Sequence, residues 1–578
     1  MSSRRLTATQ VAQMIQDDSD SDFDDDNSSD ESSDESMSGD TSDNQSDADS
    51  DDSQVLYSIP VDQWQTSQGH TPTLPVFTGQ QKLLFDSKDF APSDFFKLFL
   101  DDDLVNHIVI QTNLYAQQQL QSNPASRKPH SRMRSWEPTT PAEIRKFVGL
   151  TFLMGIIKKP KIAMYWSEDA MYRTPIFPAI MPRNRYQLLL KFLHYTDNTG
   201  APDPHDPNRD RLYKLRPLID HLFEKFQTFY DVSREVSVDE SLLLWKGRLL
   251  FRQYLPLKRS RFGIKLYKLC ESKTGYTYRF EVYVGKDSSF ALPQGVPSPP
   301  VELCASEKIV WYLMLPLLNK GHHLYCDNFY TSVSLFDALF QNQTAACGTV
   351  RSNRKDMPKT LIGNKQSVGE TSFMERGCLL AAKFTDRKDV YMLTTAHDDS
   401  CQTVSVRRRT TPTMDKPTCI LEYNKFMGGV DVSDQLMEPY AASRKTMVWY
   451  KKLSIYLLQH AMLNAFVLFR QSTATAGSAK EHFLEFMHTV IADLLLNADD
   501  ENVDIGNDEF VIRLTGRHFP EKIAATACKD KPTKRCRVCY KKGTRAESRF
   551  WCTRCPSKPA LCIDECFALY HTKIKYWK

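Results

Sequence analysis

The sequence predicts a mixed α/β sheet domain flanked by helical blocks and followed by a small cysteine-rich module. Three observations predict it. Residues 235–350 alternate strand-like runs with helical ones, as in a sheet covered by helices. Apolar residues recur at helical spacing before this region and again after residue 431. Cysteines gather after residue 535 in pairs typical of a metal-stabilised module.

The amino-terminal segment is acidic, and we expect it to stay disordered. Residues 17–52 are mostly Asp, Ser, Glu and Asn, which bury too little apolar area to offset chain entropy. Residues 1–81 carry a net charge of −16, which leaves +19 on the other 497 residues. A basic body favours a polyanionic partner, although basic surface also serves solubility alone. Runs such as Ser32–Glu35 suit an acidophilic kinase, and the alternative is a solvated tail without a partner.

No segment is expected to enter a membrane. The longest apolar run, Phe147–Ile157, has 11 residues, whereas a spanning helix needs about 18. Arg4 and Arg5 precede no apolar run, so we expect no signal peptide. We therefore expect the protein inside the cell, where thiols stay reduced.

Helices and strands follow one another in a definite order along the chain. Helical spacing covers residues 93–157 and 183–230, with a Pro- and Asp-rich loop at 201–210. Residues 357–417 are expected to form an inserted β-rich module. Residues 431–469 are helical again, and the apolar stretch from residue 450 predicts a buried helix. Between these blocks we expect strands over Glu235–Asp239, Leu249–Tyr254, Ile264–Leu269, Thr277–Val284, His322–Cys326 and Ala346–Val350, and helices over Ser306–Leu318 and Val333–Phe340.

Three aspartates stand where strands end or helices begin. Asp239 and Asp327 each end a strand-like run, and Asp431 opens a helix after Gly428 and Gly429. Carboxylates at such places can converge on one sheet edge and hold two divalent ions about 3.5–4 Å apart, with Mg²⁺ or Mn²⁺ favoured by oxygen ligands. Each aspartate also has a structural interpretation. Ser237 with Glu240 fits a capping box, Asp327 fits a turn, and Asp431 fits a helix N-cap.

The carboxyl-terminal cysteines have the spacing of zinc ligands. Two C-x2-C pairs are followed by two more cysteines and a histidine, which is one ligand short of two tetrahedral sites. His518 is the natural eighth ligand, and a single-zinc ribbon would leave it as an ordinary surface histidine. Residues 529–578 carry a net charge of +10, which suits DNA, although a protein-binding finger is the competing interpretation. The expected zinc ligands are His518, Cys536, Cys539, Cys552, Cys555, Cys562, Cys566 and His571.

Several long motifs resemble piggyBac-family transposases in order and spacing, over residues 85–578. The likeness is closest to the vertebrate members, which include active elements and domesticated copies. The motifs are Ser237–Arg248, Tyr254–Arg259 with Phe262–Lys265, Cys326–Phe329, Gly348–Asn353, Tyr423–Asp431 and Ser433–Gln435.

The resemblance implies roles for individual residues. It implies an RNase H-like catalytic fold in which Asp239, Asp327 and Asp431 form the triad that binds metal, with Asp434 as a fourth, supporting acidic ligand. It also implies a two-zinc, cross-braced finger, in which Cys552 and Cys555 join both histidines. Trp449 follows the third aspartate and either stacks on an unpaired base or belongs to the core. The residues expected to contact DNA are Lys258, Arg259, Lys265, Arg351, Arg354, Arg444, Lys445 and Trp449; the family often has Lys where this chain has Arg354.

The resemblance further implies a reaction and its partners. The implied reaction is cut-and-paste transposition at TTAA sites, with hairpins formed on the ends of the element, in a nuclear homodimer that binds Mg²⁺ and Zn²⁺. The alternative is a domesticated DNA-binding protein that keeps the fold but does not cut. The expected divisions are 1–84 acidic tail, 85–233 and 441–515 helical dimerisation and DNA-binding domain, 234–356 and 418–440 catalytic domain, 357–417 β-rich insertion, and 516–578 zinc-binding domain.

Overall fold

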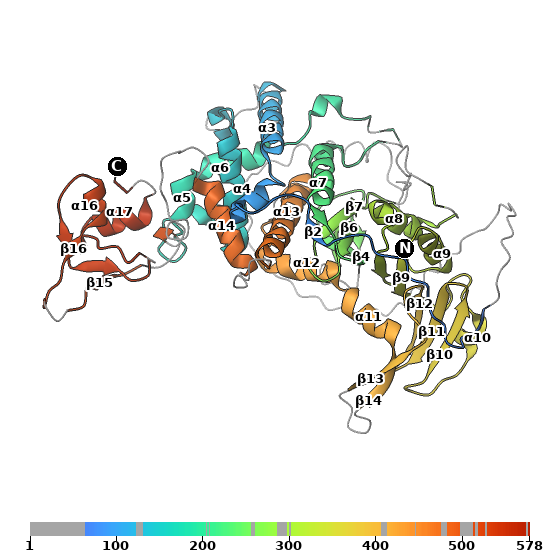
Figure 1. Ribbon diagram of the computed structural model, residues 1–578. Coiled ribbons are helices and arrows are strands. Elements are labelled where there is room, and N and C mark those ends of the chain that lie inside the picture. Colours follow the sequence, from blue (N-terminus) through green and yellow to red (C-terminus); the bar gives the residue numbers. More distant parts are fainter. Residues whose placement is uncertain are drawn as a thin grey trace, which may run out of the picture.

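The molecule is elongated, with three parts in a row (Figure 1): the cysteine-rich module, a group of helices, and a large sheet. This computed structural model describes residues 64–122, 131–203, 205–206, 209–255, 261–285, 298–299, 302–405, 413–444, 447–474, 482–496, 513–514, 518–525, 529–555, 557–573 and 576–577.

A mixed ten-stranded sheet forms the centre of the described chain. Its strand order is β1-β10-β11-β12-β9-β8-β4-β6-β5, and β7 pairs with β6. Strands β4, β6 and β7 are antiparallel, whereas β8 runs parallel to β4 and β9 parallel to β8. The strands are β1 (Gln65–Thr66), β4 (Glu235–Leu244), β5 (Gln253–Tyr254), β6 (Phe262–Glu271), β7 (Thr277–Val282), β8 (His323–Cys326), β9 (Ala345–Thr349), β10 (Thr371–Arg376), β11 (Leu379–Thr385) and β12 (Asp389–Thr394).

Helices cover the sheet and bury its central strands. Strand β6 is buried at every position after Phe262, as expected for a strand covered on both faces. Helix α12 (Gly429–Met437) packs on β4 and β6, α8 (Ala305–Met314) on β6 and β7, and α9 (Val333–Gln341) on β9 and β11.

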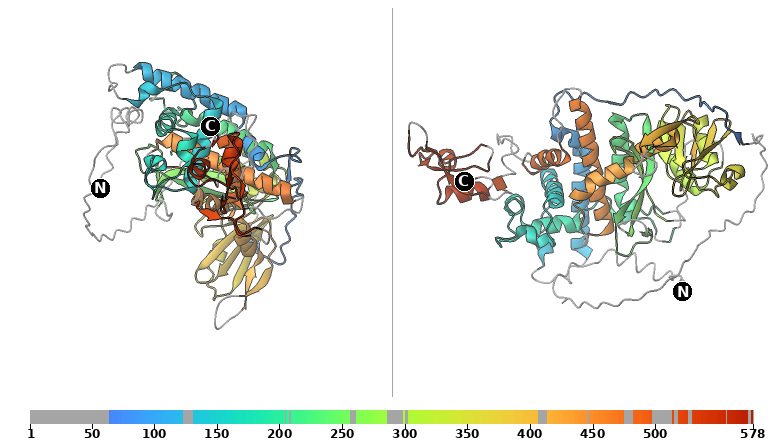
Figure 2. Two further views of the ribbon diagram at one scale, coloured as in Figure 1. Left: turned by 90° about the vertical axis from the view of Figure 1, so that its left-hand side faces the viewer. Right: turned by 90° about the horizontal axis from the view of Figure 1, so that it is seen from below.

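The long helix α13 (Trp449–Ala474) joins the helical part to the sheet (Figure 2). It packs against α2, α7 and α14. Its Asn464 side chain accepts from the Thr277 amide at 2.9 Å and donates to the Thr277 carbonyl at 2.8 Å, which satisfies the edge strand β7. The other helices of this part are α2 (Pro92–Lys97), α3 (Asp102–Ser122), α4 (Pro141–Ile156), α5 (Ile176–Ile180), α6 (Arg183–Phe192), α7 (Arg216–Thr228) and α14 (Phe483–Leu496).

Helix α13 also has the length and apolar character of a membrane-spanning helix, over Trp449–Ser472. Within that helix, 94% of the most apolar window is buried inside the protein. Burial of this extent is typical of a core helix and agrees with the buried helix expected from residue 450 onward.

Most of the expected strands and helices are confirmed, and one expectation is wrong. Only Gln253 and Tyr254 of the run 249–254 pair as a strand. The helical region expected over 431–469 is confirmed as two helices, because Pro439 has no amide hydrogen to continue α12, and α13 begins at Trp449. Residues 371–394 form strands, as expected of the insertion, and they extend the main sheet; β13 (Cys401–Ser405) and β14 (Thr413–Pro417) make a separate hairpin that leads into α11 (Thr418–Phe426).

Candidate active site and zinc centres

Two of the aspartates lie side by side, one within a strand and the other directly after the parallel strand next to it. Val238 of β4 is in register with Cys326, the last residue of β8. Asp239 is the next residue of β4, and Asp327 is the first residue after β8. Because adjacent strands lie about 4.8 Å apart, the two aspartates are neighbours. Asp239 lies within β4, which excludes the capping-box interpretation. Asp327 does form the expected turn, since its Oδ1 accepts from the Phe329 amide at 2.9 Å.

Helix α12, which carries the third aspartate, packs against β4 on both sides of Asp431. A Cβ at Gly429 would lie 2.6 Å from Ser237 Oγ, so only glycine lets the start of the helix press on β4 there. Further along α12, Asp434 Oδ2 accepts from Ser241 Oγ at 2.7 Å. Ser237 and Ser241 flank Asp239 on one face of the strand. The part of α12 that carries Asp431 therefore lies beside Asp239.

Asp431 and Asp434 have different surroundings, although both belong to α12. Asp431 is exposed in the first turn; the N-cap position is held by Gly428, which excludes the capping interpretation. Both carboxylate oxygens of Asp434 are already engaged, because Lys268 Nζ donates to its Oδ1 at 2.8 Å.

The electrostatics of the edge fit a site for a cation. Burial raises the pKa of Asp327, and the nearby Glu240 carboxylate raises it further. Burial also raises the pKa of the Cys326 thiol to about 12, with Asp327 and Asp239 both adding to the rise. Crowded carboxylates of this kind are the oxygen ligands that divalent cations favour.

Glu240 and Lys268 are the residues of this edge that sequence reasoning missed. Glu240 accepts from the Tyr330 hydroxyl at 3.2 Å and lies 3.8 Å from Lys265 Nζ, so it holds the turn that follows Asp327. One feature of the sequence indicated that Glu240 belongs to this site, which is that it directly follows Asp239. Lys268 had no signal of its own, since a lysine in an alternating strand usually faces solvent.

Two of the expected DNA-contacting arginines lie at this edge. Arg351 is exposed, and its Nε donates to Asn328 Oδ1 at 3.3 Å. Arg354 donates to the carbonyls of Asn328 and Phe329 at 2.7 and 3.0 Å. Lys265 is 7% exposed beside Glu240. The remaining lysine and arginine expectations, Lys258, Arg259 and Lys445, fall outside the described residues.

The structure corrects the DNA contacts expected of Arg444 and Trp449. Arg444 donates to the carbonyls of Lys159 and Met154, at 2.6 and 3.2 Å, and therefore binds the end of α4. Trp449 is 5% exposed and packs edge-on against Phe251 with ring centroids 5.4 Å apart. Their position in the sequence just after the third aspartate suggested contacts with DNA. In the structure, both side chains instead hold the helices together.

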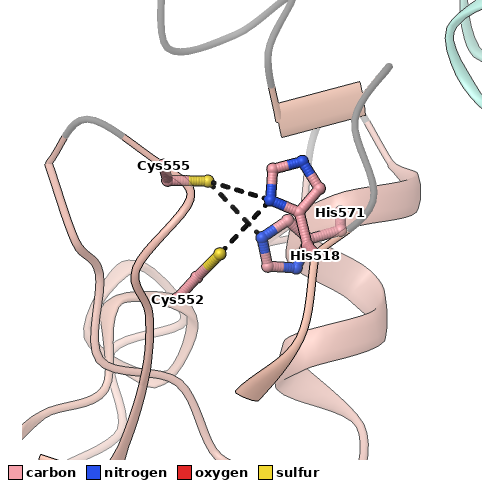
Figure 3. A group of neighbouring side chains, drawn as sticks. All are labelled: His518, Cys552, Cys555 and His571. Carbon is pink, nitrogen blue, oxygen red and sulfur yellow. Dashed lines mark hydrogen bonds between the residues drawn. The ribbon is translucent and has the colours of Figure 1, made fainter. Parts of the chain in front are cut away.

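The cysteine-rich module contains two groups of four ligands. Each group has its ligand atoms within 4.8 Å of one another. Figure 3 shows His518, Cys552, Cys555 and His571 converging from separate segments. His518 Nδ1 lies 3.2 Å from Cys552 Sγ, and His571 Nε2 lies 3.5 Å from Cys555 Sγ. The second group is Cys536, Cys539, Cys562 and Cys566.

The ligand atoms fit zinc in number, type and orientation. Four sulfur and nitrogen ligands per group match tetrahedral Zn²⁺. The other ring nitrogen of His571, Nδ1, lies 2.8 Å from the Phe567 carbonyl, the outer contact that orients a ligating histidine. The grouping is the one a cross-braced finger requires. Its short elements are β15 (Pro520–Lys522), β16 (Lys534–Arg535), α16 (Arg537–Lys541), β17 (Glu547–Ser548), β18 (Phe550–Cys552) and α17 (Cys566–Thr572).

Known families and proteins match both parts of the chain. Residues 91–466 match the family described as Transposase IS4, and residues 516–572 match the family described as DDE_Tnp_1-like zinc finger. The chain is 27% identical over 418 residues to the human PiggyBac transposable element-derived protein 3, which covers 70% of this chain and 65% of that protein. It is 25% identical over 401 residues to the human PiggyBac transposable element-derived protein 2, covering 66% of this chain and 62% of that protein.

A solved structure has the same fold. The cryo-EM structure of a piggyBac transposase synaptic complex with hairpin DNA superposes with a TM-score of 0.62 at 23% identity, over 84% of this chain and 98% of that chain. The family matches thus place the chain in a transposase family and assign a zinc-finger domain to its residues 516–572. The chain belongs to the piggyBac family.

Proposed function

We propose that this protein is a metal-dependent DNA transposase that cuts and pastes at TTAA sites through hairpin ends. The observation that carries the proposal is the placement of Asp239 in β4 next to Asp327, which directly follows the parallel strand β8. Asp431 lies on α12 between Gly429 and Asp434, which both contact β4, and this supports its membership of the same site. The similar solved structure is a synaptic complex with hairpin DNA, which supports the hairpin step.

The strand order supports an RNase H-like assignment for the catalytic domain. Three antiparallel strands, β4, β6 and β7, are followed by the parallel strands β8 and β9 next to β4. The acidic residues lie on the central strand β4 and directly after its parallel neighbour β8. This arrangement supports a site at the end of the parallel strands.

The described residues supply positioning for a phosphodiester reaction. Asp239, Asp327 and Asp431 would hold two Mg²⁺ or Mn²⁺ ions, which activate the attacking oxygen and stabilise the leaving one. Glu240 and Tyr330 fix the turn that carries Asp327. Arg351 stands exposed next to that turn and is available to a phosphate.

The proposed partners follow from charge and family. We propose that the basic zinc-binding module binds the terminal repeats of the element, and that the helical part mediates a homodimer. A nuclear location and modification of the acidic tail by an acidophilic kinase complete the proposal. A solvated tail without such a partner stays the alternative.

A second candidate is a domesticated DNA-binding protein that does not cut. The names of the human relatives, described as transposable element-derived, favour it. The chain spans only 65% of the length of the first of these relatives, so their activities do not transfer to it directly.

An excision experiment separates the two candidates. Purified full-length protein and Mg²⁺ are given a panel of plasmids, each with TTAA-flanked terminal repeats of one vertebrate element. Hairpin ends released by the wild type and not by Asp239→Asn would support the transposase. The control is Asp389→Asn, which alters an exposed aspartate of β12 in the same sheet. Binding of one repeat without cleavage in Mg²⁺ or Mn²⁺ would support the domesticated protein.

A further inference from the structure

A fully buried lysine lies directly beneath the candidate active site. Lys268, in the middle of β6, has a side chain with 0% exposure. Its Nζ donates to Asp434 Oδ1 at 2.8 Å and to Ser433 Oγ at 3.4 Å. Burial of an ammonium group is very costly unless a counter-ion accompanies it. Asp434 is that counter-ion, and its own side chain is 37% exposed.

The same carboxylate is held by a second strand. Its Oδ2 accepts from Ser241 Oγ of β4 at 2.7 Å, so one group from α12 connects to both central strands. Lys268 is the direct cross-strand partner of Asp239. The ammonium–carboxylate pair therefore lies next to a proposed metal ligand, and the lysine already balances the charge of Asp434.

The contacts around α12 leave it little freedom. A Cβ at Gly429 would lie 2.9 Å from the Glu271 carbonyl oxygen, and a Cβ at Gly275 would lie 2.9 Å from the Ser433 amide nitrogen. The helix is thus pressed on the β6–β7 hairpin at its start and tied to β4 and β6 at Asp434. Asp431 lies between these two points, one turn before Asp434.

We infer that Asp434 is a positioning residue and that Lys268 is its dedicated partner. In this inference Lys268, Asp434 and Ser241 form a clamp that fixes α12 so that Asp431 reaches the metal site. The metal ligands are then Asp239, Asp327 and Asp431, in place of the four acidic ligands expected from the resemblance. The inference rests on the proposed function, because it takes those three aspartates to bind a divalent ion.

The test measures Mn²⁺ binding to the zinc-loaded full-length protein by electron paramagnetic resonance of free Mn²⁺. The active-site component is the binding that Asp239→Asn abolishes. Asp434→Asn leaves Lys268 buried without a counter-ion, and we expect it to weaken that component at least tenfold. Lys268→Met removes the tie to β6 but keeps the Asp434 carboxylate, and we expect it to weaken that component two- to fivefold. If Asp434 is itself a ligand, loss of Lys268 frees its carboxylate for the ion, and unchanged or tighter binding of Mn²⁺ overturns the inference.

A milder variant and a matched pair guard against misfolding. Ser241→Ala removes one hydrogen bond of the clamp without changing charge, and we expect a two- to fivefold loss of Mn²⁺ affinity; unchanged affinity argues against the clamp. Lys383 and Asp389 form a similar pair in the same sheet, with the lysine 3% exposed and 3.0 Å between the charged groups. Lys383→Met and Asp389→Asn should lower the melting temperature but leave Mn²⁺ affinity unchanged. If Asp239→Asn removes no Mn²⁺ binding, the proposed function itself fails, whatever the clamp does.

Discussion

Two regions gather their ligands in different ways: the zinc-binding module, and the candidate active site around Asp239 and Asp327, which we call the catalytic edge. In the module, all eight ligands lie between His518 and His571, and the side chains stand within 4.8 Å of one another in two groups. At the catalytic edge, Asp239, Asp327 and Asp431 belong to a strand, a turn and a helix that only the folded sheet brings together. The module has a small core of its own, whereas the sheet and helices share one large core.

Because of this difference, we expect the folding of the module to depend on metal and the folding of the sheet to be independent of it. A module with so small a core needs its ions to fold, because binding of the metal supplies the folding free energy. The sheet is stable through apolar burial and presents its aspartates whether or not an ion is bound. Mutations and solution conditions should therefore affect one region and spare the other.

The largest expected effect is that of zinc removal. Each structural zinc contributes about 10–16 kcal/mol at neutral pH. A strong zinc chelator should therefore abolish amide protection in residues 518–573 and leave protection in β4, β6 and α13 unchanged. Hydrogen exchange read by mass spectrometry, together with zinc content, measures both. If the module keeps its amide protection after complete loss of zinc, it does not need its ions to fold, and the two regions do not differ in their dependence on metal.

The next effect belongs to the catalytic edge alone. Asp327→Asn keeps the shape of the turn but removes a charge needed for the metal, so cleavage of the plasmid substrate should fall at least about 10³-fold, or about 4 kcal/mol. Zinc content should stay at the wild-type value. Cys555→Ser is the matched variant of the other region, and it should lower zinc content while the sheet keeps its hydrogen-exchange protection. Loss of zinc on Asp327→Asn would show that the regions are coupled.

Acid should destabilise the sheet and the helices through buried histidines. Burial lowers the pKa of His194 and of His322 to about 4 each. Their unfolded pKa is about 6.5, so stability is full above that value and falls as the pH drops toward 4. At pH 5 each histidine should cost about 2 kcal/mol. Denaturant-dependent hydrogen exchange at pH 7 and pH 5 measures the loss, and His194→Gln should reduce it by about that amount.

The sequence predicts the two regions unequally well. The zinc ligands could be predicted from the spacing of the C-x2-C pairs, which is typical of metal sites, whereas the grouping of the eight ligands came from the resemblance. The aspartates needed the resemblance, since spacing alone cannot show that residues 239, 327 and 431 meet. Burial of Lys268 could not be foreseen, because alternation in β6 predicts faces but does not reveal that both are covered.

The errors after the third aspartate have a shared physical cause. Arg444 and Trp449 follow a break at Pro439 that returns the chain to the helical core. Arginine and tryptophan have long apolar surfaces with polar groups, so each serves a DNA surface or an interior equally well. Tertiary packing decides whether such a side chain contacts DNA or the interior, and the sequence pattern does not reveal that packing.

The smallest expected effect tests whether the two regions share one DNA molecule. Arg351 is exposed at the catalytic edge, and Arg545 is exposed on the zinc-binding module. If both arginines contact phosphates of the same duplex, Arg351→Ala and Arg545→Ala should each weaken DNA binding by about 1 kcal/mol. Each should also lower the number of counter-ions released on binding by about one. Arg354→Ala should behave differently, because its guanidinium holds the carbonyls of Asn328 and Phe329. It should lower cleavage more than binding. Salt titrations by fluorescence anisotropy on one terminal-repeat duplex measure all three variants. If Arg545→Ala alone changes the salt dependence, the duplex contacts the zinc-binding module and not the catalytic edge.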